Sequence, residues 1–276
     1  MKIGIVGLGL MGGSLGLALK KISKKYNLLG FDHNPSHTRD ALRLKLVDAI
    51  TEDFQDIKAC DVIILTVPVD AIISIAQTLT DISGHCTIID FGSSKEKISN
   101  AIPQTVRKNF VTSHPMTGTE KFGPTAAIEA LYDEKTMVIC DIEKSGDFQK
   151  GVALTIFKDI NAKIVFMDAK EHDRHAAFIS HMPHAVSYAL AKSVMGQEDP
   201  KSILALAGGG FKDMSRIAKS SPKMWEDIFR QNKTNLLHSL EHFNKELARC
   251  QEFIENEQWD ELHDWMAEAN SLHDIL

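Results

Sequence analysis

The sequence predicts two domains: an α/β domain with a doubly wound, largely parallel sheet in residues 1–168, and an all-α domain in residues 169–276. The length of 276 residues corresponds to about two domains of ~150 residues. Short, continuous apolar runs alternate with helical segments as far as Asp168, which is typical of parallel strands buried on both faces. Beyond Asp168 the strand pattern stops and helical periodicity takes over.

The composition argues against several classes of function. Lys and Arg total 31 against 37 Asp and Glu, a net charge of −6, so we expect no nucleic-acid or membrane partner. The four cysteines, at positions 60, 86, 140 and 250, form no CxxC pair and indicate neither a zinc ribbon nor a disulfide framework. Residues 3–19 are uncharged but contain six glycines, which disfavours a signal peptide or membrane span. We therefore expect a cytoplasmic protein.

The chain opens with a predicted strand, turn and helix. Lys2–Val6 is a β-branched run, the next seven residues are rich in glycine, and helical spacing follows. Gly7, Gly9 and Gly12 satisfy GxGxxG, in which the first glycine permits a tight turn, the second lets a pyrophosphate approach and the third lets helix and strand pack closely. The order predicts a Rossmann-like dinucleotide-binding unit.

An acidic residue stands where such a unit binds the cofactor ribose. The second predicted strand, Tyr26–Phe31, ends at Asp32, which is 20 residues after Gly12. A carboxylate there accepts a hydrogen bond from the 2′-hydroxyl of NAD and repels the 2′-phosphate of NADP, and the next three residues include no Arg. Asp32 therefore favours NAD. The alternative is that Asp32 only begins the turn before Pro35.

The ligand crevice of a doubly wound sheet lies at the carboxyl ends of its strands. Val67 and Pro68 end one such strand and are candidates for lining the nucleotide pocket. His114 ends another and is our candidate general base, because a neutral imidazole beside a nicotinamide can accept a hydroxyl proton while hydride leaves the same carbon. The alternative is a turn histidine before Pro115. The remaining strands are predicted at Asp61–Val67, Thr87–Phe91, Phe110–Ser113, Thr136–Cys140 and Lys163–Phe166.

Four histidines fall within 13 residues at the start of the helical half, and their spacing places them in pairs on one helix face: His172, His175, His181 and His184. Pro183 interrupts a simple helical zinc motif and no Cys lies nearby, so we predict no metal and expect buried or substrate-facing histidines.

A glycine-rich turn at 207–210 opens a short helix and precedes Arg216. The forked guanidinium of Arg216 can hold a carboxylate through two hydrogen bonds, although a surface ion pair is the alternative. Further on, Ser221 and Pro222 predict the start of a long helix. Apolar residues then advance by alternating steps of four and three from Leu236 to Ile254, a heptad seam compatible with a homodimer or with packing inside the domain.

Five segments together resemble the prephenate dehydrogenase family of tyrosine biosynthesis, which includes arogenate-using members. The resemblance covers both halves of the chain. It rests on GLGLMGGS near the start, DFGSSK (90–95), SHPMTGTEKFG (113–123), SHMPHA (180–185) and GGGFKDMSRIAKSSPKMW (208–225). It implies a helical dimerisation domain and an NAD-dependent oxidative decarboxylation of prephenate to 4-hydroxyphenylpyruvate.

The resemblance also implies residue roles. His114 resembles the base that takes the proton of the ring hydroxyl, and Ser93 the residue that orients the hydroxyl, the base and the nicotinamide. Arg216 resembles the residue that binds a substrate carboxylate, and His184 a substrate contact. Pocket or gating positions are implied for Asp213, Glu120 and Trp225.

The chain departs from the family pattern at Thr117 and Phe122, where the family often has Ala and Ser, so the shape of the pocket floor and inhibition by tyrosine are open. We expect a monofunctional enzyme without a chorismate mutase or ACT domain. Rival hypotheses are an arogenate dehydrogenase, a non-catalytic NAD-sensing protein, and a hydroxyacid dehydrogenase with a catalytic lysine, for which Lys170 lacks a recognisable motif.

Overall fold

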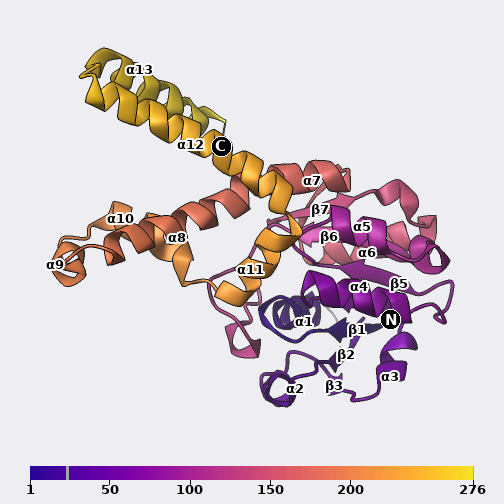
Figure 1. Cartoon of the computed structure of the whole chain (residues 1–276). Coiled ribbons are helices and arrows are strands. Elements are labelled where there is room, and N and C mark those ends of the chain that lie inside the picture. The colour runs from indigo at the N-terminus through magenta and orange to yellow at the C-terminus, as the bar shows by residue number, and fades with distance from the viewer. Residues whose placement is uncertain (23–24, 276) are drawn as a thin grey trace.

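A computed structural model describes residues 1–22 and 25–275 and unites the strands of this part of the chain in one eight-stranded sheet (Figure 1). The order is β3-β2-β1-β4-β5-β6-β7-β8; β7 runs antiparallel to β6, and all other neighbours are parallel. The predicted doubly wound, largely parallel sheet is therefore confirmed. The strands are β1 (Lys2–Val6), β2 (Asn27–Phe31), β3 (Ala49–Ile50), β4 (Val62–Leu65), β5 (Thr87–Asp90), β6 (Phe110–Pro115), β7 (Thr136–Cys140) and β8 (Lys163–Met167).

Helices cover both faces of this sheet because its central strands are apolar on both sides. Ile64 of β4 packs in one core with Leu15 and Phe157, whereas the adjacent Ile63 packs in a second core with Ile72. The first core lies under α1 and α6, and the second under α3, α4 and α5. These helices are α1 (Leu10–Ile22), α2 (Pro35–Arg43), α3 (Phe54–Lys58), α4 (Val69–Thr78), α5 (Glu96–Ala101) and α6 (Asp147–Asp159).

Two local predictions are corrected in this half. The glycine-rich turn is shorter than predicted, because α1 begins at Leu10 and Gly12 lies within its first turn. The two-residue strand β3 was not predicted, since it pairs with β2 alone and carries no apolar run. Neither correction moves the carboxyl ends of the strands.

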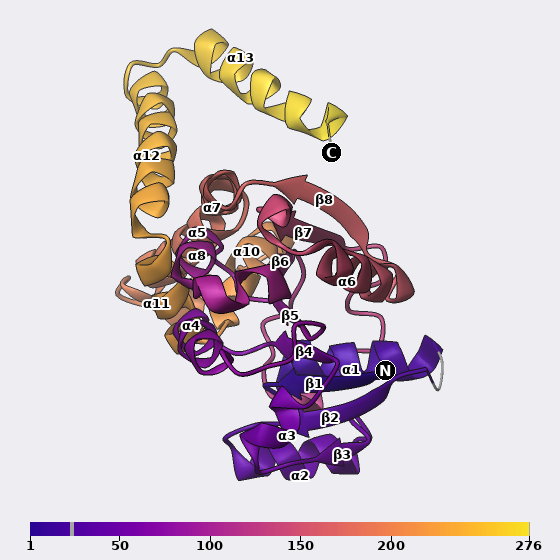
Figure 2. The ribbon, with the colours of Figure 1, turned by 90° about the vertical axis from the view of Figure 1, so that its right-hand side faces the viewer.

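The chain after Asp168 is helical throughout its described residues, as predicted (Figures 1 and 2). Both views show α12 and α13 extending away from the sheet, while α11 lies beside α4. A π-helical turn over Ala177–His181 joins α7 to α8. The helices are α7 (Ala169–Ala176), α8 (Met182–Met195), α9 (Pro200–Ala205), α10 (Gly209–Ser215), α11 (Pro222–Gln231), α12 (Lys233–Glu255) and α13 (Trp259–Asn270).

The prediction of one long helix from Ser221 is wrong, because this segment forms two helices, α11 and α12. Ser221 caps α11 as predicted, its hydroxyl accepting from the backbone N–H of Met224 at 3.4 Å. The helix then breaks at the buried Asn232, whose side-chain amide donates to the backbone oxygen of Asp173 at 2.6 Å. Because Asn232 is bound to α7, α11 ends there and α12 leaves in a new direction.

Within the described residues, no helix is both long enough and apolar enough to cross a membrane. All four cysteines are free thiols, three of them buried. Burial raises the pKa of Cys86 to about 12, so this thiol stays protonated and is a packing residue rather than a nucleophile.

Candidate active site

The glycine loop between β1 and α1 has the geometry that its three glycines predict. Gly7 has a φ of +94°, and a Cβ there would lie 2.7 Å from the carbonyl oxygen of Thr66. A Cβ on Gly12 would lie 1.9 Å from the carbonyl oxygen of Gly7, so the helix packs against the turn as only glycine allows. At Gly9, by contrast, no described atom beyond the adjoining residues of the chain lies within 4 Å of the Cβ position. The loop is thus tightly packed at Gly7 and Gly12 and open at Gly9, which leaves room for a pyrophosphate to approach its backbone.

Asp32 is joined to this loop by a hydrogen bond. The backbone N–H of Leu8 donates to Oδ2 at 2.8 Å, and that of Asn34 donates to Oδ1 at 2.8 Å. The ring Nδ1 of His37 lies 3.2 Å from Oδ2, a contact that the sequence pattern did not indicate. Asp32 therefore does begin the turn before Pro35, and it also places a carboxylate at the edge of the glycine loop.

The end of β4 borders the same loop. The Val67 side chain lies 2.8 Å from the Cβ position of Gly7, so a larger residue at position 7 would collide with it. Pro68 is the N-cap residue of α4. The structure thus brings Gly7, Asp32 and Val67 together, as expected for residues that hold one nucleotide.

His114, on β6, belongs to a chain of hydrogen-bonded side chains. Its Nδ1 lies 2.8 Å from Nε2 of His172, and Nδ1 of His172 lies 2.8 Å from Oδ1 of Asp173. The Asp173 carboxylate accepts, so His172 carries its proton on Nδ1 and offers Nε2 as acceptor. His114 then donates through Nδ1, which leaves its Nε2 free to accept a proton.

The surroundings keep His114 neutral. Burial first, and then the positive charge that His172, Lys95 and His181 can carry, lower the pKa of His114 well below its usual 6.5. Burial also lowers the pKa of His172, although Asp173 opposes that shift. A neutral imidazole with one free nitrogen is the state that a general base requires.

A buried ion pair fixes the two strand ends that carry Ser93 and His114. Lys95 and Asp90 are both fully buried, and the Lys95 ammonium binds the Asp90 carboxylate and donates to the carbonyl oxygen of Ser113 at 2.6 Å. The backbone N–H of Lys95 also donates to Asp173 at 2.7 Å. Lys95 therefore ties β5, β6 and α7 together and holds the Ser93 loop against the histidine chain.

Residues of the helical domain form a second cluster. The His184 ring stacks on Trp225, with centroids 3.5 Å apart and an angle of 22° between the planes. His184 donates through Nδ1 to the carbonyl oxygen of Ser180 at 2.9 Å, and this leaves Nε2 as an acceptor. Trp225 is buried and its indole N–H has no partner among the described residues. Arg216 is near enough to His184 to contribute to lowering the pKa of the ring, although burial is the larger cause.

Arg216 also faces the loop that follows His114. Its guanidinium lies 3.8 Å from the Glu120 carboxylate, a long and solvent-exposed contact that a ligand can replace at small cost. Asp213 is exposed on α10, one turn before Arg216. At the two departures from the family pattern, the Thr117 hydroxyl donates to the carbonyl oxygen of Leu131 at 3.1 Å, and the Phe122 side chain is 78% exposed.

The four clustered histidines separate into different environments. His172 and His181 are buried and hydrogen-bonded, whereas His175 lies at the surface near Glu171. Across the described residues, no three His, Cys, Asp or Glu side chains are grouped as metal ligands. Sequence reasoning missed the partnership of His114 with His172 and Asp173, and the histidine cluster was the signal that could have indicated it.

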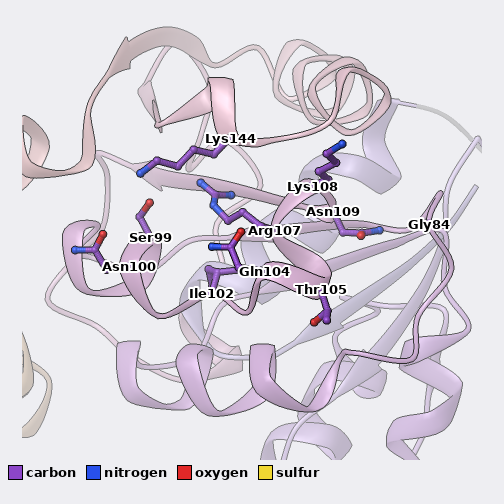
Figure 3. A pocket seen from close by; sticks show the side chains of 10 residues that line it. All are labelled: Gly84, Ser99, Asn100, Ile102, Gln104, Thr105, Arg107, Lys108, Asn109 and Lys144. Atoms are coloured by element: carbon purple, nitrogen blue, oxygen red, sulfur yellow. The ribbon is translucent and has the colours of Figure 1, made fainter.

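A cavity of about 720 Å³ lies elsewhere, at the edge of the sheet where β5 and β6 begin (Figure 3). No residue predicted for the site lines it. Its buried Arg107 donates to the carbonyl oxygen of Phe110 at 3.0 Å. The other guanidinium nitrogens are out of contact with solvent and near the negative charges of Asp141 and Glu143, so Arg107 is a structural cation. The lining residues are Gly84, Ser99, Asn100, Ile102, Gln104, Thr105, Arg107, Lys108, Asn109 and Lys144.

A dinucleotide-binding domain whose strand ends present a neutral histidine defines a nicotinamide-dependent dehydrogenase. Two sequence models agree with that class. "Prephenate dehydrogenase, nucleotide-binding domain" matches residues 15–166, and "Prephenate dehydrogenase, dimerization domain" matches residues 168–268. The chain belongs to the prephenate dehydrogenase family.

Individual relatives agree over almost the whole chain. The prephenate dehydrogenase of Bacillus subtilis is 31% identical over 99% of this chain and 75% of its own length. The cyclohexadienyl dehydrogenase of Zymomonas mobilis is 29% identical, covering 97% and 93%. The crystal structure of Aquifex aeolicus prephenate dehydrogenase with hydroxyphenyl propionate and NAD+ superimposes with a TM-score of 0.92 at 32% identity, covering 99% and 97%. Synechocystis arogenate dehydrogenase superimposes with a TM-score of 0.82 at 30% identity, covering 99% of both chains.

These findings confirm four predictions: the family, the two-part fold, an NAD-dependent oxidoreductase, and NAD as the cofactor. They do not separate prephenate from arogenate, because relatives of both kinds match at similar identity.

Proposed function

We propose that the protein catalyses the oxidative decarboxylation of prephenate to 4-hydroxyphenylpyruvate. The observation that carries this proposal is the hydrogen-bonded series His114–His172–Asp173, which leaves one neutral imidazole nitrogen free at the carboxyl end of β6. This is the same end of the parallel strands as the glycine loop that follows β1. Arogenate is the second candidate substrate, favoured by the similarity to Synechocystis arogenate dehydrogenase. The two substrates share the reacting ring and differ in the side-chain keto or amino group.

The cofactor is held by the residues around the glycine loop. Gly7, Gly9 and Gly12 shape a cradle for the pyrophosphate, Asp32 accepts from the ribose, and Val67 with Pro68 lines the nucleotide pocket. NAD, when bound, supplies the acceptor for the hydride.

His114 is the general base of the proposed reaction. Its free Nε2 takes the proton of the ring hydroxyl as hydride leaves the same carbon, so a carbonyl forms there. The bond to the departing carbon dioxide then breaks, and its electron pair moves through the ring to the carbonyl oxygen. That oxygen takes the proton back from the His114 imidazolium, so the ring becomes a phenol. His172 and Asp173 stabilise the imidazolium that forms, and Ser93 orients the hydroxyl.

The helical domain binds the side-chain end of the substrate. Arg216 holds a carboxylate through its forked guanidinium and exchanges its contact with Glu120 for that anion. His184, fixed against Trp225, offers Nε2 to a polar group, and Asp213 stands at the rim. The sheet domain thus binds the ring hydroxyl of the substrate, and the helical domain binds its side chain.

We propose a domain boundary between residues 168 and 169, a homodimer and a cytoplasmic location. The boundary is supported by the last strand, which ends at Met167, and by α7, which begins at Ala169. The homodimer is supported by the dimerisation-domain match and by exposed apolar side chains on α12 and α13. The free thiols support a reducing compartment.

The test is nicotinamide reduction by the purified protein in four mixtures, pairing prephenate or arogenate with NAD or NADP. We expect the fastest reduction with prephenate and NAD. A preference for arogenate would keep the mechanism and reassign the side-chain contacts. No reduction in any mixture, by folded protein that still binds NAD, would overturn the proposed reaction and favour an NAD-sensing role.

A further inference from the structure

The carboxylate of Asp70 on α4 forms hydrogen bonds with two other helices near the proposed site, α5 and α11. Asp70 is the second residue of α4 and lies two residues after Pro68. Its Oδ2 accepts from Arg230 of α11 at 2.6 Å, and its Oδ1 accepts from Gln231 of α11 at 2.7 Å and from Lys97 of α5 at 2.9 Å. We name these four residues the Asp70 cluster.

Each helix of the cluster leads to a different part of the site. Helix α4 follows the strand end that borders the cofactor loop, and α5 follows the loop that carries Ser93. Helix α11 carries Trp225, which supports His184, and it ends at Gln231 beside Asn232. Figures 1 and 2 both show α11 beside α4. The Asp70 cluster therefore connects the cofactor side of the sheet domain with the substrate side of the helical domain.

The cluster is anchored at both ends. Arg230 is held on its own helix by Asp227, at 2.8 Å, so it reaches Asp70 from a fixed position. The side-chain amide of Asn232, the next residue after Gln231, donates to the backbone oxygen of Asp173 at 2.6 Å. Asp173 is the residue whose carboxylate binds His172. The three donors hold the pKa of Asp70 well below its usual range, Arg230 contributing most, so the carboxylate is charged at neutral pH.

We propose that Asp70 is a positioning residue that couples the two halves of the site, so that a bound cofactor tightens the binding of the substrate. An individual exposed ion pair contributes little to stability, but a carboxylate that ties two domains together favours the arrangement in which the two domains are in contact. A cofactor that fixes the start of α4 also fixes the position of α11, because Asp70 bonds the two helices together. Helix α11 in turn positions Trp225 and His184. This inference rests on the proposed function.

The test compares Asp70→Asn with the wild type and with a matched control, Asp81→Asn. Asp81 accepts from Lys58 at 2.7 Å within the sheet domain, and among the described residues none of its hydrogen bonds or ion pairs reaches the helical domain. The dissociation constant of hydroxyphenyl propionate is measured by calorimetry with and without saturating NAD. Steady-state constants for prephenate are measured in parallel, and thermal melts verify folding.

We expect wild type and Asp81→Asn to bind hydroxyphenyl propionate at least about fivefold more tightly when NAD is present. Asp70→Asn loses most of that factor and shows a raised KM for prephenate, while its affinity for NAD alone changes less than about twofold. Asp70→Glu restores part of the coupling. High salt weakens the coupling in the wild type, because the cluster is exposed.

Equal coupling in Asp70→Asn and wild type would overturn the inference, and so would a wild type that is active but shows no effect of NAD on analogue binding. A wild type without activity on prephenate or arogenate would instead overturn the proposed function, and the binding experiment still reports on the coupling in that case.

Discussion

The sheet domain buries most of its large apolar side chains, whereas the helical domain leaves a larger share of them exposed. Two cores of buried apolar residues lie on either side of the strands of the sheet domain. In the helical domain Leu247 is 57% exposed, Ile254 50% and Trp259 57%. One chain therefore completes the cofactor half by itself, but the substrate half has an apolar surface that a second copy can cover.

The largest effect is expected from placing charged residues on the exposed apolar face of the helical domain. If the proposed homodimer forms through α12, Leu247→Asp combined with Ile254→Asp puts four carboxylates into its interface, and we expect the dimer dissociation constant to rise by about 10³-fold or more. Sedimentation velocity measures it. The control is Leu42→Asp, an exposed leucine on α2 of the sheet domain that should leave the dimer intact. A double variant that sediments as the wild-type dimer would remove this face from the interface.

The cofactor half can be made inactive without loss of its ligand. His114→Asn removes the free Nε2 and should lower kcat by about 10²-fold or more, because no other group takes the hydroxyl proton. NAD affinity should persist, since the glycine loop does not contact His114. Turnover and NAD titrations are compared with those of His85→Asn, a histidine elsewhere in the sheet domain. Near-normal turnover in His114→Asn would exclude the residue as base.

The substrate half responds differently to loss of its cation. Arg216→Gln keeps a polar side chain but removes the charged fork, so we expect substrate binding to weaken by about 2 to 4 kcal/mol, mainly through KM. Steady-state kinetics with prephenate measure this effect. Arg249→Gln, on the exposed face of α12, serves as the matched control. An unchanged KM would mean that Arg216 serves only its ion pair with Glu120.

The sequence predicted the features of the sheet domain that depend on local residues, and it missed contacts between residues that are distant in sequence. The strands of the sheet domain follow from apolar runs. The glycine loop follows from a local motif, since the positive φ of Gly7 and the close approach of Gly12 to the Gly7 carbonyl oxygen lie within six residues. The partner of His114 is 58 residues away, and the break at Asn232 depends on a hydrogen bond to Asp173 across 59 residues. Such contacts are set by tertiary packing. Spacing along the chain carries no information about them.

Acid should destabilise the junction between the two halves. His181 is buried there beside Asn232 and Trp225, and burial lowers its pKa to about 4. The unfolded chain takes up this proton near pH 6.5, before the folded chain does, so its contribution to stability is complete above pH 6.5 and is lost as the pH falls towards 4. The loss amounts to about 3 kcal/mol.

Urea unfolding between pH 7 and pH 4 measures this loss. His181→Asn retains an acceptor near the position of Nδ1 but cannot titrate, so the free energy of unfolding should depend less steeply on pH than in the wild type. His263→Asn replaces an exposed histidine on α13 and should retain the wild-type slope. Identical slopes in His181→Asn and wild type would assign the acid sensitivity to other buried groups, such as His114 and His172.

The smallest expected effect separates two roles of one residue in the cofactor half. Asp32 holds the glycine loop through Leu8 and begins the turn through Asn34, so Asp32→Ala should lower kcat/KM with NAD. If the carboxylate also repels the 2′-phosphate, kcat/KM with NADP should fall less or rise, and the preference for NAD should narrow by about tenfold. Asn34→Ala, which removes only the cap of α2, is the control. An equal loss with both cofactors would assign Asp32 to the turn and the choice of cofactor to another group.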